Sequence, residues 1–383
     1  MKIPFNRPVV VGREHEYMGD AISRRRISGD GYYTKRCNEW LERSIGTKKA
    51  LLTTSCTHAI EMTALLLDIG PDDEIIMPSF TFVSTANAFV LRGARPVFVD
   101  IRPDTLNIDE RAIEKAITAR TRAIVVVHYA GVACEMDTIC EIADRHGVTV
   151  IEDNAHGLFA SYRDRPLGSF GTFATQSFHE TKNVMCGEGG ALLINDASYI
   201  ERAEIVREKG TNRARFFRGL VDKYTWVEPG SSYLPSDLLA AFLFAQLENA
   251  ETIQARRKHV WNRYHRELGD WCAEYGVRPP VVPEHCRQAY HMYYMLLQNV
   301  ADRDALIAYL AAHEINSVFH YVPLHGSEYG AHLGYRPEDL PVSVSSSERL
   351  IRLPMYNDMS DAETDRVVEA VHSFRPISSG VLA

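Results

Sequence analysis

The fold is decided by the stretch from Phe173 to Leu193, F-A-T-Q-S-F-H-E-T-K-N-V-M-C-G-E-G-G-A-L-L. Residues 173–178 are apolar with interspersed Thr and Ser, and 191–194 are apolar, so both predict strands. Lys182 lies between them in a polar turn that ends in the glycine-rich residues 187–190. Two interpretations stay open: a solvated loop lysine, which is the common case, or an amine that forms a Schiff base because its neighbours lower its pKa.

Around this stretch, strand-like and helical segments alternate, which predicts an α/β fold with a mostly parallel sheet covered by helices. Ligands of such sheets bind at the carboxyl ends of the strands. Ser55, Phe82, His128 and Asp153 each lie at or just past a predicted strand end, so we expect them to converge in space. The predicted strands are 49–53, 74–77, 96–100, 123–128 and 148–152, and the predicted helices are 59–67, 84–92, 108–119 and 136–146.

With 383 residues, the chain is long for a single core, so we expect a large and a small domain. A long helix predicted over 236–257 leads out of the first part. The remainder mixes short strands, predicted over 290–297 and 316–319, with helices, which is typical of an α+β domain. We therefore expect a large domain over 1–257 and a small domain over 258–383, with an irregular loop at 210–226 that is too long for an ordinary connection.

Composition narrows the class of protein. A content of 45% hydrophobic and 24% charged residues is typical of a globular protein, and the net charge of −8 argues against nucleic acid as the main partner. No apolar run approaches the ~18 residues of a membrane span, and the N-terminal residues do not have the pattern of a signal peptide. The seven cysteines have no C-x-x-C spacing, which indicates reduced thiols. We expect a cytoplasmic protein without a membrane partner.

Two further features point to chemistry. Residues 54–58, T-S-C-T-H, join a strand to a helix, where backbone N–H groups bind anions; a plain helix N-cap is the alternative. Asp153 ends a strand, either as a simple cap or as the carboxylate that keeps a pyridinium nitrogen protonated. Together with Phe82 and Lys182, these features fit an enzyme that uses pyridoxal 5′-phosphate (PLP) and has the aspartate-aminotransferase fold.

The sequence resembles the DegT/DnrJ/EryC1/StrS family of sugar aminotransferases over nearly its whole length. The family also includes dehydratases, which carry His at the position of Lys182. Because this chain has lysine there, it resembles the transaminases of the family. Three further blocks, 128–137, 207–213 and 222–226, resemble a branch of the family that acts on dTDP-linked sugars. The segments that carry the family resemblance are P-S-F-T-F-V-S-T-A-N-A (78–88), V-I-E-D-N-A-H-G (150–157), S-F-H-E-T-K-N (177–183), G-E-G-G-A (187–191) and H-Y-V-P-L-H (320–325).

The resemblance implies roles for the residues around the cofactor ring. Lys182 is implied to bind PLP covalently and then to move a proton, and Asp153 to pair with the pyridine nitrogen. Phe82 is implied to stack on one face of the ring. His156 is implied to lie near the ring and its 3-hydroxyl, where many relatives have Gln.

The resemblance also implies how the cofactor phosphate is held. Backbone N–H groups of Cys56 and Thr57, and hydroxyls of Ser55 or Thr57 and of Ser177, are the implied donors. Ser232 stands where relatives often have an Asn that reaches the phosphate from the partner subunit, so the exchange for Ser puts this contact in question. The resemblance nevertheless implies a homodimer, because both subunits of the family's enzymes build each active site.

For the substrate, the resemblance implies that Tyr321 and His325 face the sugar-nucleotide site. Arg213, Arg215 and Arg218 lie in the irregular loop and are candidates for binding a diphosphate or a donor carboxylate. Their alternative is a surface position paired with acidic neighbours such as Asp222.

The expected function is the transfer of an amino group from L-glutamate to C4 of a dTDP-4-keto-6-deoxyhexose. Two alternatives stay open. One is transfer to another nucleotide-linked keto-sugar, with a 3-keto group or a UDP or GDP nucleotide. The other is a non-enzymatic homologue that binds sugar nucleotides.

Overall fold

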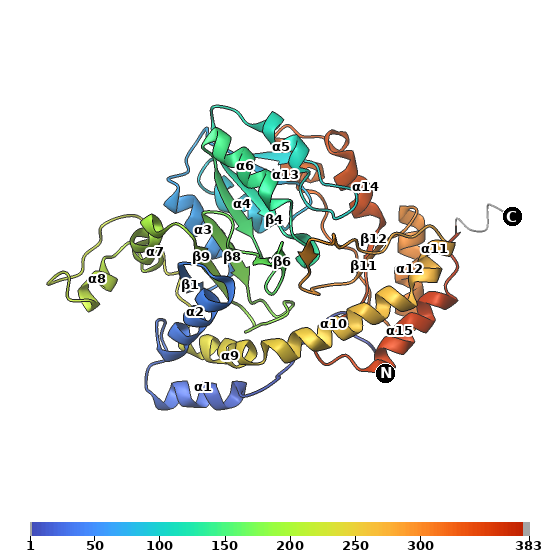
Figure 1. The fold of residues 1–383 in the computed structure, drawn as a ribbon, viewed down its shortest axis with the longest axis horizontal. Helices are drawn as coiled ribbons and strands as arrows, with labels where there is room; N and C mark the ends of the chain where they lie inside the picture. Colours follow the sequence, from blue (N-terminus) through green and yellow to red (C-terminus); the bar gives the residue numbers. More distant parts are fainter. Residues whose placement is uncertain (1, 378–383) are drawn as a thin grey trace.

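A seven-stranded sheet forms the centre of the protein, seen in a computed structural model that describes residues 2–377 (Figure 1). The strand order is β1-β9-β8-β5-β4-β2-β3. The five strands from β8 to β3 run parallel to one another, whereas β9 is antiparallel to both β1 and β8. The expected α/β fold with a mostly parallel sheet is thus confirmed. The strands are β1 (Lys49–Thr53), β2 (Glu74–Pro78), β3 (Arg95–Val99), β4 (Thr121–Val127), β5 (Thr149–Asp153), β8 (Phe173–Ser177) and β9 (Gly190–Ile194).

Both faces of this sheet are buried, because its strands are continuous apolar runs whose side chains alternate between two helical layers. In β4, Ala123 and Val125 pack in one core, and Ile124 and Val126 pack in the other. One layer contains α3 (Cys56–Leu66), α4 (Val83–Val90) and α7 (Ile200–Arg207). The other contains α2 (Tyr32–Ile45), α5 (Glu110–Ala116), α6 (Met136–His146) and α9 (Asp237–Glu248), with α1 (Glu14–Ser23) packed on α9.

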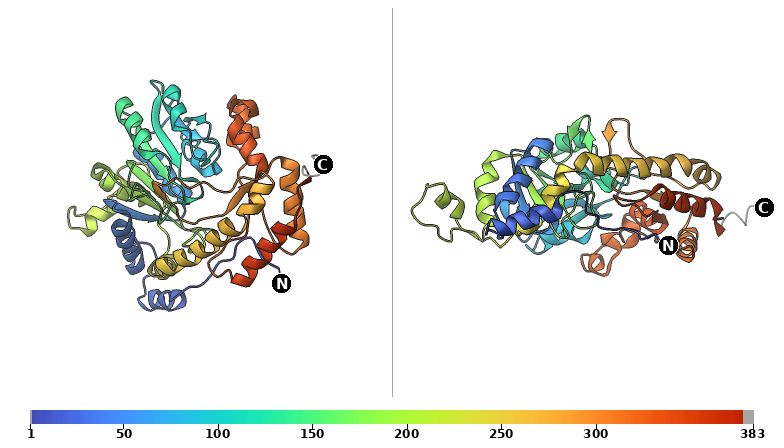
Figure 2. Two further views of the ribbon diagram at one scale, coloured as in Figure 1. Left: turned by 45° about the vertical axis from the view of Figure 1, so that its right-hand side comes forward. Right: turned by 90° about the horizontal axis from the view of Figure 1, so that it is seen from below.

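A separate core lies in the C-terminal part of the chain. It combines apolar residues of four helices and of a two-stranded sheet, and Ile3 joins it from the N-terminal segment. Figures 1 and 2 place this part and the N-terminal segment at the end of the molecule opposite α8 (Arg213–Phe217). The elements of the C-terminal part of the chain are α10 (Ala250–Glu267), α11 (Gly269–Glu274), β11 (Tyr294–Leu296), α12 (Val300–Ala312), α13 (Glu328–His332), α14 (Pro341–Arg349), β12 (Leu350–Arg352) and α15 (Asp361–Ser373). The residues that flank α13 pack instead in the core of the large sheet.

The helix expected over 236–257 is in fact two helices, α9 and α10, that meet at Asn249. The side chain of Asn249 donates a hydrogen bond of 2.9 Å to the carbonyl of Ala245, a local contact that competes with helix continuation. The proposed domain boundary after residue 257 falls inside α10, which runs from the large sheet to the C-terminal core (Figure 1).

Other differences concern short elements. The strand expected over 290–297 is limited to β11, and the one over 316–319 makes only a single bridge, between Val318 and Arg352. The loop at 210–226 contains the helix α8. A small sheet of β6 (Ser161–Tyr162), β7 (Arg165–Pro166) and β10 (Cys286–Arg287) was not predicted, because two-residue strands leave no periodicity in the sequence.

Across residues 2–377, no helix is both long and apolar enough to cross a membrane. The same residues contain no group of three or more His, Cys, Asp or Glu side chains that could hold a metal ion.

Candidate active site

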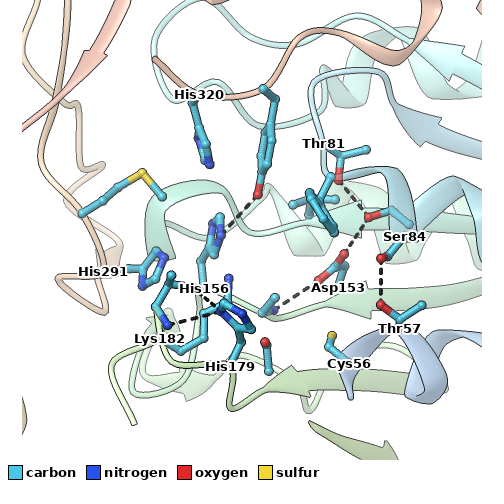
Figure 3. Close-up of a pocket in the computed structure, with 18 of the residues that line it drawn as sticks. Cys56, Thr57, Thr81, Ser84, Asp153, His156, His179, Lys182, His291 and His320 are labelled. Carbon is cyan, nitrogen blue, oxygen red and sulfur yellow. Dashed lines mark hydrogen bonds between the residues drawn. The ribbon is translucent and has the colours of Figure 1, made fainter. Parts of the chain in front are cut away.

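A cavity of about 590 Å³ lies at the carboxyl ends of the central strands (Figure 3). Its volume is in the usual range for small-molecule sites. The strands contribute Asp153 at the end of β5 and Ser177 at the end of β8, and the loop after β2 contributes Phe82. His320 and other residues from the C-terminal part close the cavity from the other side. The position matches the expectation for a parallel sheet.

Lys182 lies in this cavity, in the connection from β8 to β9. A hydrogen bond of 2.8 Å from the N–H of Phe178 to the carbonyl of Gly189 closes the connection. Within residues 2–377, Nζ of Lys182 has no hydrogen-bond or ion-pair partner. Burial lowers the pKa of Lys182 to about 8. The cavity therefore contains an unpaired amine, a substantial fraction of which is neutral near pH 8.

Asn183 fixes the position of this lysine. Its Nδ2 donates to the carbonyl of Ala289 at 2.7 Å, and its Oδ1 accepts from Nδ1 of His291 at 2.8 Å. The side chain of Asn357 in turn donates to the Asn183 carbonyl at 3.0 Å. The lysine turn is thus anchored to the C-terminal part of the chain.

Asp153 is buried and held by two donors. Oδ2 accepts from the hydroxyl of Thr85 at 2.8 Å, and Oδ1 accepts from the N–H of Ala155 at 3.2 Å. The neighbouring Glu152 faces the opposite side of the sheet, where it accepts bonds from the backbone N–H groups of Gly168, Phe170 and Gly171. Alternation along β5 therefore gives two adjacent carboxylates different environments: Glu152 is fully engaged in the scaffold, and Asp153 faces the cavity.

The start of α3 forms the end of the cavity beside β8 and β9. Ser55 is the N-cap of this helix, and its Oγ accepts from the N–H of His58 at 3.1 Å, so the N-cap interpretation of the sequence is confirmed for this residue. The first N–H groups of a helix, here those of Cys56 and Thr57, have no intrahelical acceptor. A Cβ atom on Gly190 would lie 2.3 Å from the Cys56 nitrogen, so β9 can approach the start of α3 only with glycine at this position.

Hydroxyl groups complete this end of the cavity. Oγ1 of Thr57 lies 2.7 Å from Oγ of Ser84. Ser177 also lines the cavity, and within residues 2–377 its hydroxyl has no hydrogen-bond partner. Helix N–H groups together with nearby hydroxyls are a typical phosphate-binding arrangement.

His156 is buried against the cavity, and its ring stacks on His291 with 4.3 Å between ring centroids. Its Nε2 lies 3.3 Å from the hydroxyl of Tyr321, whereas its Nδ1 is buried without a partner. Burial, followed by the charges of Lys182 and Arg352, holds the pKa of His156 well below its usual range, so the ring is neutral at pH 7. A buried ring nitrogen without a partner indicates a ligand with a matching polar group.

Phe82 and Tyr321 form part of the cavity wall. Phe82 is 57% exposed, and its ring lies 6.4 Å from that of Tyr321. His325, expected at the substrate site, lies outside the cavity lining: it is fully buried, with Nδ1 2.6 Å from the Ser79 hydroxyl and Nε2 3.1 Å from the carbonyl of Pro337. The structure thus brings Tyr321 to the cavity and places His325 in the supporting scaffold. His128, also expected to converge with the site, does not line the cavity, because its Nε2 lies 3.0 Å from Oε2 of Glu152 on the opposite side of the sheet.

Arg213, Arg215 and Ser232 do not reach this cavity within one chain. Arg213 and Ser232 line a second cavity of about 910 Å³, whose lining includes seven Lys and Arg residues and three Asp and Glu residues. Arg213 pairs with Glu208 at 3.3 Å, and Arg215 with Glu201 at 3.2 Å. Both arginines thus have acidic neighbours, as the alternative expects, although within residues 2–377 neither pairs with Asp222.

The cavity residues that were not predicted from the sequence include His291, His320 and Arg352. All three lie in the C-terminal part of the chain, His291 and Arg352 outside the recognised motifs, and only folding brings them to Lys182. The segment H-Y-V-P-L-H includes His320, so the family resemblance could have drawn attention to that residue.

The family model of the DegT/DnrJ/EryC1/StrS aminotransferase family matches residues 10–372. The chain belongs to this family. Its aminotransferases use PLP, so PLP is the cofactor of this protein. The cavity fits that group, since it offers an unpaired amine, a carboxylate at its base, the open end of α3 and the unpartnered nitrogen of His156.

Solved structures of related proteins have the same fold over nearly the whole chain. The PLP-form of the Streptococcus pneumoniae protein Spr1654 is 26% identical, with a TM-score of 0.90 over 100% of both chains, and a PMP-form is also known. The aminotransferase TlmJ from Streptoalloteichus hindustanus is 27% identical, with a TM-score of 0.89 over 100% of both chains. A DegT/DnrJ/EryC1/StrS aminotransferase from Brucella abortus is 30% identical, with a TM-score of 0.84 over 94% of this chain and 95% of that one.

Proposed function

We propose that this protein is a dTDP-4-amino-4,6-dideoxygalactose transaminase, which moves an amino group from L-glutamate to C4 of a dTDP-4-keto-6-deoxyhexose. The observation that carries the aminotransferase chemistry is the presence of an unpaired Lys182 amine and the Asp153 carboxylate in one cavity. A homologue that only binds sugar nucleotides would not need this pair.

Each part of the cofactor would have its own residues. Asp153 would hold the ring nitrogen, and Phe82 would cover one face of the ring. The unpartnered Nδ1 of His156 would accept a hydrogen bond from the 3-hydroxyl. The phosphate would lie at the start of α3, bound by the N–H groups of Cys56 and Thr57 and by the hydroxyls of Thr57 and Ser177; because the Ser55 hydroxyl already caps α3, it is the weaker candidate of the set.

PLP supplies an aldehyde that takes up the amino group and a ring that withdraws electrons from the neighbouring carbon. The chain supplies the proton transfer. In its neutral form, the Lys182 amine removes a proton from Cα of the donor, and its lowered pKa favours that form. The Asp153 carboxylate would pair with the ring nitrogen and keep it protonated, and the Thr85 hydroxyl orients that carboxylate.

The proposed substrate rests on the blocks 128–137, 207–213 and 222–226, because residues that distinguish substrates must lie outside the shared cofactor motifs. The second cavity supports an anionic substrate, since basic side chains predominate in its lining. Arginine there would bind a diphosphate despite the net charge of −8, because distant charges are screened over ~8 Å.

We also infer a homodimer in which the loop 210–226 and Ser232 of one chain complete the active site of the other. In support, Phe217 and Trp226 of this loop are 68% and 75% exposed, which is unusual for large apolar side chains of a monomer. We further infer that the protein is cytoplasmic. In support, all seven cysteines are free, as is usual in a reducing compartment.

The decisive experiment is mass spectrometry of the products from L-glutamate and a panel of nucleotide-linked keto-sugars. We expect one product, aminated at C4 of the dTDP-linked 6-deoxyhexose. Amination at C3, or a preference for UDP- or GDP-sugars, would refute the substrate and leave the aminotransferase assignment intact.

A further inference from the structure

Arg352 is the last residue of β12 and lines the same cavity as Lys182. The backbone places it there through a hydrogen bond of 2.7 Å from its N–H to the carbonyl of Val318. Its guanidinium lies over the ring of Phe5 at 4.7 Å, and Nε and Nη2 donate to the carbonyl of Phe319 at 3.2 and 3.1 Å. The side chain is therefore held in a fixed orientation before any ligand binds.

The positive charge of Arg352 is not neutralised. No carboxylate of residues 2–377 forms an ion pair with it, and Nη1 has no acceptor among them. Two of its five N–H groups point to Phe319, so three remain, among them both hydrogens of Nη1. A pair of donors on Nη1 and Nη2 suits a carboxylate.

Arg352 also acts electrostatically on the residues around Lys182. Burial lowers the pKa of His320, and the charge of Arg352 is the next cause. Burial likewise lowers the pKa of Lys182, and Arg352 adds to that effect. Within residues 2–377, Lys182 and Arg352 are the only Lys or Arg residues that line the cavity. The loop arginines Arg213, Arg215 and Arg218 do not line it.

We propose that Arg352 binds the α-carboxylate of the amino donor, an inference that rests on the aminotransferase function proposed above. The α-carboxylate is bonded directly to the carbon from which Lys182 removes a proton, so its binding group must share the cavity with Lys182. A sugar diphosphate is separated from C4 by the hexose ring and therefore lies farther from the reacting atoms. The cofactor phosphate has its own donors at the start of α3, in another part of the chain.

The test uses the PLP-loaded protein with Arg352→Gln and Arg352→Lys. Arg349→Gln is the matched control, since Arg349 lies on the preceding helix, α14, and does not line the cavity. The loss of visible absorbance on addition of L-glutamate gives the apparent dissociation constant of the donor half-reaction. We expect this constant to rise roughly 10- to 100-fold in Arg352→Gln, on the scale of a lost hydrogen bond to a charged group. Arg352→Lys should lose less, and Arg349→Gln should match the wild type.

Two further measurements separate binding from folding and from activity. Calorimetry with glutarate, a dicarboxylate without an amino group, should detect binding to the wild type and none to Arg352→Gln. A simple alkylamine without a carboxylate should react equally slowly with both proteins. Circular dichroism and the PLP content should be unchanged, because Arg352 lies apart from the phosphate donors.

Three results would overturn the proposal: an unchanged glutamate constant in Arg352→Gln, a rise in the KM of the sugar nucleotide alone, or a loss of PLP in a folded variant. If the wild-type protein accepts no amino acid as donor, the aminotransferase function itself fails, an outcome distinct from these three.

Discussion

Asn183 accepts a hydrogen bond of 2.8 Å from Nδ1 of His291, a residue 108 positions away. Because Asn183 follows Lys182 directly, this contact ties the reactive lysine to the C-terminal part of the chain. The ring of His291 also stacks on that of His156, whose Nδ1 is buried without a partner. His291 therefore supports both the turn that carries Lys182 and the ring of His156.

Replacement of Asn183 by Ala should therefore destabilise the protein. It leaves the carbonyl of Ala289 and Nδ1 of His291 buried without partners, which should cost about 2 to 4 kcal/mol of unfolding free energy. Urea denaturation measures this change. Asn183→Asp, which keeps an acceptor for His291, should lose less, and equal stability of Asn183→Ala and wild type would contradict the anchoring role.

Lys182→Ala should abolish the visible absorbance of the purified protein, because the covalent link to PLP requires the amine. Borohydride treatment followed by mass spectrometry should find the reduced adduct on Lys182 of the wild type and none on the variant. Lys115→Ala, on the distant helix α5, is the control and should keep both signals. A reducible protein-bound adduct in Lys182→Ala would assign the linkage to another residue.

The pH dependence of PLP uptake follows from the lowered pKa of Lys182. The neutral amine is the reactive form and predominates above its pKa, so a pKa of about 8 predicts a rate that rises about fivefold from pH 7 to 8 and levels off above it. An amine with the usual pKa of 10.5 would continue to gain about tenfold per pH unit up to pH 10. The rate at which the visible band appears in the apoprotein measures this, with a free lysine derivative to correct for titration of PLP itself.

Asp153→Ala should lose far more activity than stability. Removal of the charge partner of the ring nitrogen should raise the barrier by about 3 kcal/mol or more, at least 100-fold in kcat. Thr85→Val, which removes only the hydroxyl that orients the carboxylate, should cost less. The test is kcat at saturating substrates, with the PLP content measured in parallel. Near-normal turnover of PLP-loaded Asp153→Ala would mean that Asp153 only caps the following turn.

Arg213→Ala should raise the KM of the sugar nucleotide and leave the glutamate half-reaction nearly intact, because Arg213 lines the second cavity rather than the one with Lys182. Arg145→Ala is a matched control, since Arg145 forms a similar surface pair, with Glu114, outside both cavities. Steady-state kinetics give both constants. An unchanged KM would mean that the pair with Glu208 is only a surface ion pair.

The sequence by itself determined the alternation of strands and helices, because apolar runs and turn residues act over short distances. From residues 173–193 it also predicted two strands around a lysine. The sequence did not predict that β9 is antiparallel to its neighbours, because strand pairing is set by tertiary packing. The break at Asn249 was also missed, because one polar residue in a long helical pattern does not show where its side chain will bond.

For the site, the sequence identified Lys182, Asp153 and the turn at 54–58, since each belongs to a local motif at a strand end. Only the tertiary structure decided which distant residues join them. It brought Arg352 and His291 into the cavity, placed His325 in the scaffold, and kept Arg213 and Arg215 at a distance within one chain. The physical reason is that a side chain's role depends on burial and on partners far away in sequence, as the depressed pKa of Lys182 demonstrates: it follows from the enclosing walls of the cavity.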